Sequence, residues 1–544
     1  MNTRQLQTDK NQKLYHALLG ILLVCALAMM MLLSYWACKY SYYGAVDGRT
    51  RGVLVGDKTW AHIAVFFAAS LCTMGIDKVL MKKDKSQQEK ICLCTLIVTS
   101  VIAFILGVFY VCKNPYYPVG DQINTTAFAA YCRDGNFSML SIGGYVGMYQ
   151  QQKGLAILYE ILFTLFGDFN YRPAKILHVV WWILTILAGY GFLKLNTDRP
   201  VFRMLYCVMM LGCFPLLFYL PYIYGDVLSI SFGIILFYGV AAYEHSGQKR
   251  YIALASFAAG LAVLARKNTW IVLVAVAVYV LLVSLRKKKV RYLMAGTAIL
   301  LTAALSVKAV DVIYEVRSGY PSGVGIPSIL WVAMGLQETE GRAGVYNRYQ
   351  QATFTDYDCQ QELAAQQGKE YIRERLEEFS QDPGMAFNFF KNKVEGQWIE
   401  PMYAALESTE SFEEGAELSP VLESLYYGEL GRTIWKLTNY YQSILYLAGL
   451  MALVMLGILW WKKKEVPISL WLPWIAVFGG FLFSILWEAK SRYVFPYCVF
   501  MILYAPEGLY QMGLLLCKLP KLRKFKKSGH TQDKGEEASL RETA

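Results

Sequence analysis

Apolar segments about as long as a membrane-spanning helix are the feature that most restricts how this chain can fold. A bilayer core is about 30 Å thick, and a helix needs roughly 20 apolar residues to cross it. Charged residues make up 17% of the chain, against roughly 25% in soluble domains. The sequence therefore predicts an all-α polytopic membrane protein. Thirteen apolar stretches are visible, at residues 14–36, 60–79, 91–111, 154–166, 176–195, 204–223, 227–243, 251–265, 269–285, 292–312, 441–461, 467–487 and 491–515.

The basic residues lie mostly in the connections between these stretches. Cytoplasmic loops of membrane proteins are enriched in Lys and Arg, so the basic clusters predict which helix ends face the cytoplasm. The net charge of +12 has the same explanation, and no nucleic-acid partner is predicted. The clusters are Arg4, Lys10 and Lys13; Lys82, Lys83 and Lys85; Arg199 and Arg203; Lys249 and Arg250; the run Arg286 to Arg291; Lys462 to Lys464; and Lys518 to Lys527.

The stretch 154–166 is the weakest candidate for a crossing. As a helix it reaches about 20 Å, short of the hydrocarbon core. Thirteen crossings would put the two basic termini on opposite sides of the membrane. With this stretch at the surface, twelve crossings remain and every basic cluster falls inside. We therefore expect about 12 transmembrane helices, cytoplasmic termini, and a juxtamembrane helix in the first large outer loop.

Two long segments then lie outside the membrane, one before residue 154 and one from Tyr314 to about Tyr440. The second is too long for an ordinary connection and is either functional or a small domain. Its residues Gln360 to Phe379 predict a solvated amphipathic helix. The stretch 14–36 is too long for a signal-peptide core, so we expect a retained span. The chain divides into a two-span region 1–90, a transmembrane core 91–313 with an outer loop 112–175, an outer segment 314–440, C-terminal transmembrane helices 441–515 and a basic cytoplasmic tail 516–544.

In this topology, ionisable residues from distant parts of the chain collect at the outer boundary. Each also has an ordinary structural explanation. Asp121 fits a solvated loop equally well, and Asp226 fits a cap on the next helix, although a carboxylate that opens an apolar span is costly unless paired or functional. Lys153 and Lys267, taken singly, are more simply interfacial residues. The set is Asp121, Lys153, Arg172, Asp226, Arg266, Lys267, Glu488, Lys490, Arg492 and Tyr493.

These residue types suit chemistry on a lipid-linked sugar. Arg266, Lys267 and Arg492 lie outside against the usual charge bias, which indicates that they bind an anion. A lipid phosphate needs such cationic donors, and a hydroxyl that attacks a glycosyl phosphate needs a carboxylate base. The same set would also serve to bind or move such a lipid without chemistry.

The sequence offers little for other chemistries. It lacks the glycine patterns of nucleotide-binding loops, and its five His are scattered without metal-ligand spacing. We expect no cofactor and no metal site, and a divalent cation held by carboxylates is not indicated. A disulfide between Cys112 and Cys132 would lie outside the membrane, but spacing alone does not decide it.

With these residues in view, the chain resembles the GT-C class of membrane glycosyltransferases, which use polyprenyl-phosphate sugars. The class includes protein O-mannosyltransferases and the bacterial enzyme that adds aminoarabinose to lipid A, and the resemblance is strongest to Gram-positive bacterial members. It covers roughly residues 91–500 and rests on the order and spacing of short motifs. These are GDQ at Asp121, YVGMYQQQKGLAILYEILFTLFG followed by Arg172, YIYGD at Asp226, GLAVLARKN, and EAKSRYVFPY.

The chain departs from the class in two places. Gln122 follows Asp121 where many members carry a second acidic residue, which leaves the identity of the base open. The two spans before residue 91 look like an addition to the usual core, and we assign them no catalytic role. The WWDYG-type motif of oligosaccharyltransferases is absent, which argues against transfer of a whole glycan to Asn.

The resemblance implies an inverting enzyme of the bacterial plasma membrane that transfers a sugar from undecaprenyl phosphate to a cell-envelope glycan, lipid or protein outside the cytoplasm. Two alternatives remain: a flippase or transporter of lipid-linked glycans, and an inactive accessory subunit. Trp398 and Tyr403 either stack on a sugar or, more simply, pack the outer segment against the membrane. The implied roles are catalysis for Asp121 and Asp226; phosphate binding for Lys153, Arg172, Lys267 and Arg492; and contact with sugar or acceptor for Gln122, Tyr224, Glu488 and Tyr493.

Overall fold

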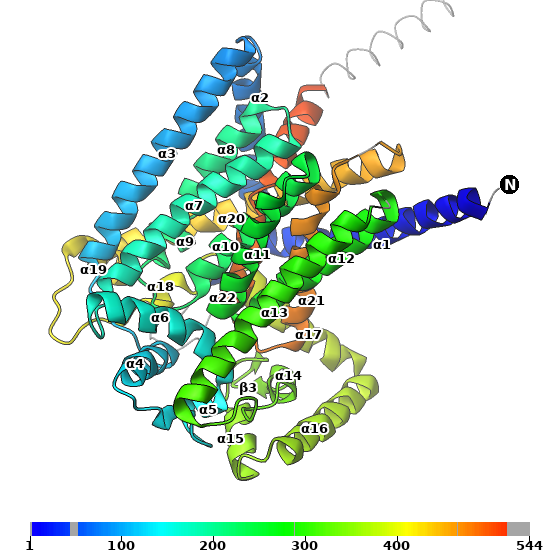
Figure 1. Ribbon diagram of the computed structural model, residues 1–544. Coiled ribbons are helices and arrows are strands. Elements are labelled where there is room, and N and C mark those ends of the chain that lie inside the picture. Colours follow the sequence, from blue (N-terminus) through cyan, green and yellow to red (C-terminus); the bar gives the residue numbers. More distant parts are fainter. Residues whose placement is uncertain (1–2, 44–52, 288, 465, 519–544) are drawn as a thin grey trace, which may run out of the picture.

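The computed structural model describes residues 3–43, 53–287, 289–464 and 466–518. Helices dominate the fold (Figure 1). The only strand pairs among the described residues are antiparallel and short: β1 (Tyr40–Tyr43) with β2 (Val53–Gly56), and β3 (Glu338–Thr339) with β4 (Arg342–Ala343). The expected helical class is confirmed. Most of the predicted basic tail, from residue 519, lies outside the described residues.

Nine helices in the described part of the chain are long and apolar enough to cross a membrane, as expected for a multi-pass membrane protein. A tenth span results if α22 (Ser491–Met501) and the helix Ala505–Lys518, which meet at 60°, are counted as one. The nine helices are α1 (Thr3–Lys39), α2 (Thr59–Leu80), α3 (Lys85–Lys113), α7 (Arg172–Asn196), α10 (Asp226–Ser246), α12 (Trp270–Lys287), α13 (Val290–Ser318), α20 (Glu429–Trp461) and α21 (Leu472–Leu486).

Two predicted crossings take a different form. The stretch 204–223 is divided into α8 (Pro200–Leu211) and α9 (Phe214–Phe218), because Gly212 follows the first helix and Pro215 starts the second. The stretch 251–265 forms α11 (Lys249–Ala265), whose 17 residues fall short of the roughly 20 in a typical span. Nine or ten long spans are therefore present among the described residues, and the expected twelve is reached only if these two shorter elements also cross.

The stretch expected at the membrane surface forms α6 (Lys153–Phe166), whose 14 residues are too few to cross a bilayer. It lies at one end of the bundle with α4 (Asp121–Arg133) and α5 (Tyr145–Met148) (Figure 1). Two ion pairs tie it to α13: Lys153 to Asp311, and Glu160 Oε1 to Arg317 Nη2 at 2.7 Å. These pairs explain why this largely apolar helix stays at the end of the bundle.

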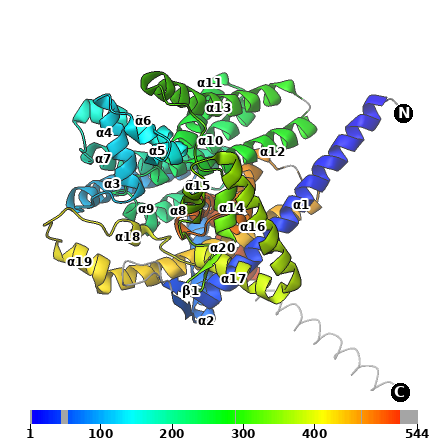
Figure 2. The same ribbon diagram turned by 90° about the horizontal axis from the view of Figure 1, so that it is seen from below.

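The predicted outer segment, residues 314–440, lies at the same end of the bundle as α4–α6 (Figures 1 and 2). The amphipathic helix predicted at residues 360–379 is present as α16, which buries only Ala364, Gly368 and Phe379. Trp398 is fully buried and donates its indole N–H to Ser484 Oγ at 3.0 Å, so it packs. Tyr403 is buried as well. The helices of the segment are α14 (Ile329–Gly335), α15 (Tyr349–Asp356), α16 (Gln361–Gln381), α17 (Pro383–Trp398), α18 (Ala405–Ser408) and α19 (Pro420–Tyr427).

The helices α1 and α2 in the first 90 residues are integrated into the bundle. α1 packs along α20, and α2 packs against α20 and α8. The N–H of Tyr42 in β1 donates to Ile399 O at 3.0 Å, which joins the first hairpin to the outer segment. Asp77, near the end of α2, pairs with Arg199 Nη1 at 2.9 Å. α1 and α2 therefore pack within the helical bundle, and whether they are an addition to a smaller core stays a prediction.

One of the basic connections expected in the cytoplasm can be placed relative to α4–α6. The α2–α3 connection, with Lys82, Lys83 and Lys85, lies at the end opposite to α4–α6 (Figure 1). The cysteines of the chain are all free, so Cys112 and Cys132 do not form a disulfide in this structure.

Candidate functional site

Three helix ends meet near α4–α6. α10 begins at Asp226, α11 ends at Ala265, and α22 begins at Ser491. Gly225 permits the approach, because a Cβ at this position would lie 2.0 Å from the carbonyl oxygen of Ala265. The residue after α11 and the second residue of α22 are thereby brought against the first residue of α10.

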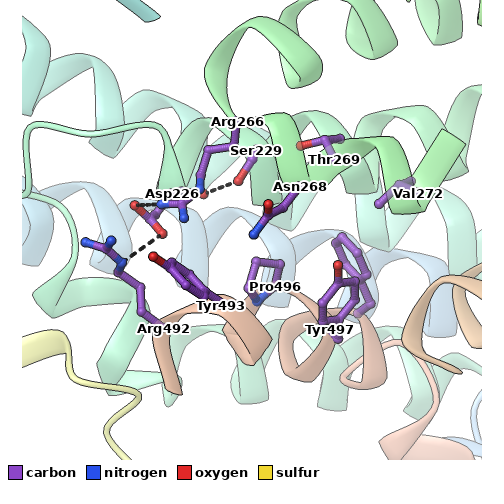
Figure 3. A pocket seen from close by; sticks show the side chains of 11 residues that line it. Asp226, Ser229, Arg266, Asn268, Thr269, Val272, Arg492, Tyr493, Pro496 and Tyr497 are labelled. Atoms are coloured by element: carbon purple, nitrogen blue, oxygen red, sulfur yellow. Dashed lines mark hydrogen bonds and ion pairs between the residues drawn. The ribbon is translucent and has the colours of Figure 1, made fainter. Parts of the chain in front are cut away.

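A buried carboxylate between two guanidinium groups is the centre of this junction (Figure 3). Asp226 is 2% exposed, and its Oδ2 lies 2.6 Å from Arg266 Nη1. Its Oδ1 lies 3.9 Å from Arg492 Nε. The N-cap of α10 is Gly225, without a side-chain cap, so pairing with arginine replaces the capping role considered for Asp226. We name Asp226, Arg266 and Arg492 the arginine cluster.

Positive charge exceeds negative charge in the arginine cluster, since two guanidinium groups share one carboxylate. Arg492 is 6% exposed, and its Nε–H has no hydrogen-bond partner among the described residues. A buried donor without a partner is costly. An added anion at this position would therefore be stabilised.

Tyrosine rings surround the two guanidinium groups. Arg266 lies 5.1 Å from the ring centre of Tyr224 and 5.4 Å from that of Tyr493. Arg492 lies 5.3–5.5 Å from Tyr222, Tyr224 and Tyr493. Cations at this distance are attracted to the faces of aromatic rings, so the rings help to hold the arginines in place.

Two glutamines connect the arginine cluster to the outer loop. Gln122 of α4 donates to the hydroxyl of Tyr222, and Gln152 donates to the hydroxyl of Tyr224 at 2.6 Å. Arg492 also donates to Tyr222. The outer loop around α4–α6 is thus hydrogen-bonded to the arginine cluster.

A cavity opens beside the arginine cluster (Figure 3). Its wall is charged and polar near Asp226 and apolar along α12 and α22. Its volume of about 20 Å³ holds about one water molecule, so a larger ligand with a charged head and an apolar tail would have to widen it. It is lined by Asp226, Ser229, Arg266, Asn268, Thr269, Val272, Arg492, Tyr493, Pro496, Tyr497 and Phe500.

Two further carboxylates lie nearby. Burial raises the pKa of Glu488 to about 7; the charge of Asp121 adds to this rise, and Lys490 opposes it. Tyr493 donates to Glu488 Oε1 at 3.4 Å. Asp121 is exposed and accepts a hydrogen bond from Tyr145 at 2.8 Å. One buried and one accessible carboxylate within electrostatic range of each other can bind or move a proton.

The other predicted phosphate ligands lie outside the arginine cluster. Lys153 is buried and paired with Asp311. Lys267 is exposed and donates to Ser328 Oγ at 3.3 Å. Arg172 is exposed at the start of α7. Of the four predicted cations, only Arg492 contacts Asp226, and the phosphate-binding role of the others stays a prediction.

Sequence reasoning left several residues of this junction without an assigned role. Arg266 was noted because of its predicted location outside the membrane, but the phosphate-binding role was assigned to its neighbour Lys267. Arg266 has an extended backbone (φ −151°, ψ 127°) and points inward. The sequence alone does not reveal which of the two neighbouring side chains, Arg266 or Lys267, points inward. Tyr222 is the first residue of the motif YIYGD, and only this motif marks it in the sequence.

Comparisons with protein-family models, with curated proteins and with solved structures find no match for this chain. Within the described ranges, no group of three or more His, Cys, Asp or Glu is arranged to hold a metal ion.

Proposed function

We propose that this chain is a membrane glycosyltransferase that transfers one sugar from a polyprenyl-phosphate donor to an acceptor outside the cytoplasm, as its resemblance to the GT-C class implies. One observation carries the proposal: the arginine cluster has surplus positive charge beside a cavity with an apolar wall, next to two carboxylates.

The donor fits the arginine cluster by charge and polarity. Its phosphate would accept hydrogen bonds from Arg492 and Arg266, since guanidinium groups match phosphate oxygens in geometry. Its isoprenoid chain would require the apolar side of the cavity, where Val272 and Phe500 are buried, to open toward the bilayer. Asp226 would hold both arginines in place before the donor arrives.

The transfer step follows from this arrangement. The acceptor hydroxyl oxygen attacks the anomeric carbon, and the bond from that carbon to the phosphate oxygen breaks. Polyprenyl phosphate leaves with the electron pair, and its added charge is stabilised by the arginines. The proton of the acceptor goes to Asp121, the accessible carboxylate, or to Glu488. In this proposal Gln122, Tyr224 and Tyr493 would contact the sugar or acceptor.

The orientation belongs to the same proposal. The arginine cluster lies toward α4–α6, away from the basic α2–α3 connection. If basic connections face the cytoplasm, the site faces outward, in a bacterial plasma membrane with both termini inside. The lipid donor and the cell-envelope acceptor would meet there.

A flippase for lipid-linked glycans is the second candidate. Transporter sites usually lie near the bilayer midplane, at broken helices. The bend at Met501 is such a break, which is the observation that favours this candidate. The arginine cluster, by contrast, lies at helix ends, and this location favours transfer. An inactive accessory subunit would need none of these charges.

Donor turnover by the purified protein tests the proposal. With a panel of polyprenyl-phosphate sugars and envelope acceptors, wild type should consume one donor and release polyprenyl phosphate. Asp121→Asn should lower that rate by about 100-fold or more, because a positioned base contributes roughly 10²–10⁴. Asp134→Asn, at the C-cap of the same helix α4, is the matched control and should be active. A donor that crosses the membrane of liposomes without being consumed would instead favour the flippase.

A further inference from the structure

A row of aromatic side chains connects Asp121 to Glu488. Tyr145 donates to Asp121, and its ring centre lies 5.1 Å from that of Tyr149. The ring of Tyr149 lies 6.3 Å from Trp331. Trp331 and Trp487 stack with centres 5.9 Å apart and planes at 4°, and Trp487 directly precedes Glu488. With Tyr346, described next, these residues form what we name the aromatic wall.

Tyr346 stands on a loop that is fixed from both sides. The N–H of Gly344 donates to Gln337 O at 2.7 Å, and the N–H of Ala489 donates to Gly344 O at 2.7 Å. The side chain of Asn347 donates to Gln337 Oε1 at 2.6 Å. The loop is therefore joined to the segment that carries Glu488.

Tyr346 remains accessible in this rigid setting. Its side chain is 48% exposed and interacts with that of Tyr149. Burial raises the pKa of Tyr346, and the charges of Asp121 and Glu488 add to the rise. The ring is thus half exposed to solvent and within electrostatic range of both carboxylates. A tyrosine with one side exposed to solvent and the other packed against protein is suited to contact an amphipathic ligand.

We infer that the aromatic wall binds a sugar ring of the acceptor, so that the acceptor is a carbohydrate chain. The inference rests on the proposed function. The C–H face of a pyranose ring is apolar and packs on an aromatic ring, while its hydroxyls need polar partners. The accessible ring of Tyr346 offers the apolar face, since Trp331 is buried behind it, and the hydroxyls of Tyr145 and Tyr149 belong to the same row of side chains. A sugar on the ring of Tyr346 would lie within electrostatic range of Asp121 and Glu488.

Protein and lipid acceptors fit this surface less well. An extended peptide commonly binds by adding a strand to a sheet edge. The nearby strands, β3 and β4, have two residues each and offer no such edge. A lipid acceptor needs an apolar surface that faces the bilayer, whereas Tyr149, Trp331 and Tyr346 belong to the outer loops and outer segment.

Binding of neutral oligosaccharides to the purified full-length protein tests the inference. The probes are linear oligosaccharides of glucose, galactose and N-acetylglucosamine, with a serine-containing peptide and glycerol phosphate as comparisons. Binding is measured by saturation-transfer NMR. Tyr346→Ala removes the ring, Tyr346→Phe keeps it, and Tyr427→Ala removes an exposed tyrosine on α19.

We expect one oligosaccharide to bind wild type, Tyr346→Phe and Tyr427→Ala equally, and Tyr346→Ala about tenfold more weakly, in the range of a single aromatic contact. Preference for the peptide or glycerol phosphate, or equal binding by Tyr346→Ala, would overturn the inference. Donor turnover is measured on the same preparations. A protein that binds oligosaccharide through Tyr346 but consumes no donor would fail the proposed function, while normal turnover without sugar binding would fail the inference alone.

Discussion

Asp226 and Glu244 lie at opposite ends of α10, and both are buried acids. Glu244 is fully engaged: its carboxylate accepts from Lys287 at 2.8 Å, from Tyr279 at 3.0 Å and from the N–H of Ser469 at 2.8 Å. Asp226 is shared by two arginines beside a cavity. One end of the helix is closed by matched donors and acceptors, and the other retains an unmatched donor, the Nε–H of Arg492.

The comparison shows that burial of charge does not by itself indicate a site. A buried acid whose donors come from two neighbouring elements fixes them to its own helix, as Glu244 of α10 does for α12 and the turn η4 (Ile468–Trp471). The end with surplus donors and space beside them is the one that can accept a ligand. The following predictions test that contrast.

The largest effect is expected at the arginine cluster. Arg492→Gln should lower donor turnover by about 100-fold, because a hydrogen bond to a charged group is worth roughly 1.5–3 kcal/mol and 1.4 kcal/mol is a factor of ten. Turnover is measured under kcat/KM conditions on purified protein. Glu244→Gln, at the other end of α10, should lower thermal stability but leave turnover per folded molecule unchanged. Equal loss of turnover in the two variants would remove the contrast.

A smaller effect is expected from pH. Burial raises the pKa of Glu488 to about 7, so its neutral acid predominates below pH 7 and its carboxylate above. If the carboxylate acts in transfer, the rate should rise roughly tenfold between pH 6 and pH 8. Glu488→Gln should abolish this rise.

Glu400 provides the control for the pH profile. Burial also raises its pKa to about 7, but it accepts the N–H groups of Met402 and Ala404 and lies among packed residues. Glu400→Gln should keep the wild-type pH profile. A pH profile that changes in Glu400→Gln but not in Glu488→Gln would show that Glu400, and not Glu488, is the titrating group.

Much of the fold could be predicted from apolar segment length and loop charge. The short helix α6 was predictable because thirteen residues cannot cross a bilayer, and α16 was predictable from its periodicity. The division of 204–223 at Gly212 and Pro215 was harder to predict, since glycine and proline also occur within continuous membrane helices.

The candidate site was only partly predictable. Helix ends mark where charges gather, so Asp226 and Arg492 could be named. Which cation turns inward depends on backbone conformation at the helix end, as at Arg266 and Lys267. Lys153 shows the other limit, because its partner Asp311 is distant in sequence and only the packing of α6 on α13 reveals the pair.

The most direct test of the arginine cluster is its affinity for the head group alone. Polyprenyl phosphate and uncharged polyprenol of the same length are titrated into purified wild type, Arg492→Gln and Glu244→Gln in detergent micelles. Wild type and Glu244→Gln should bind the phosphate at least about tenfold more tightly than the alcohol, and Arg492→Gln should bind the two alike. Equal affinity of wild type for both lipids would contradict a phosphate site at this end of α10.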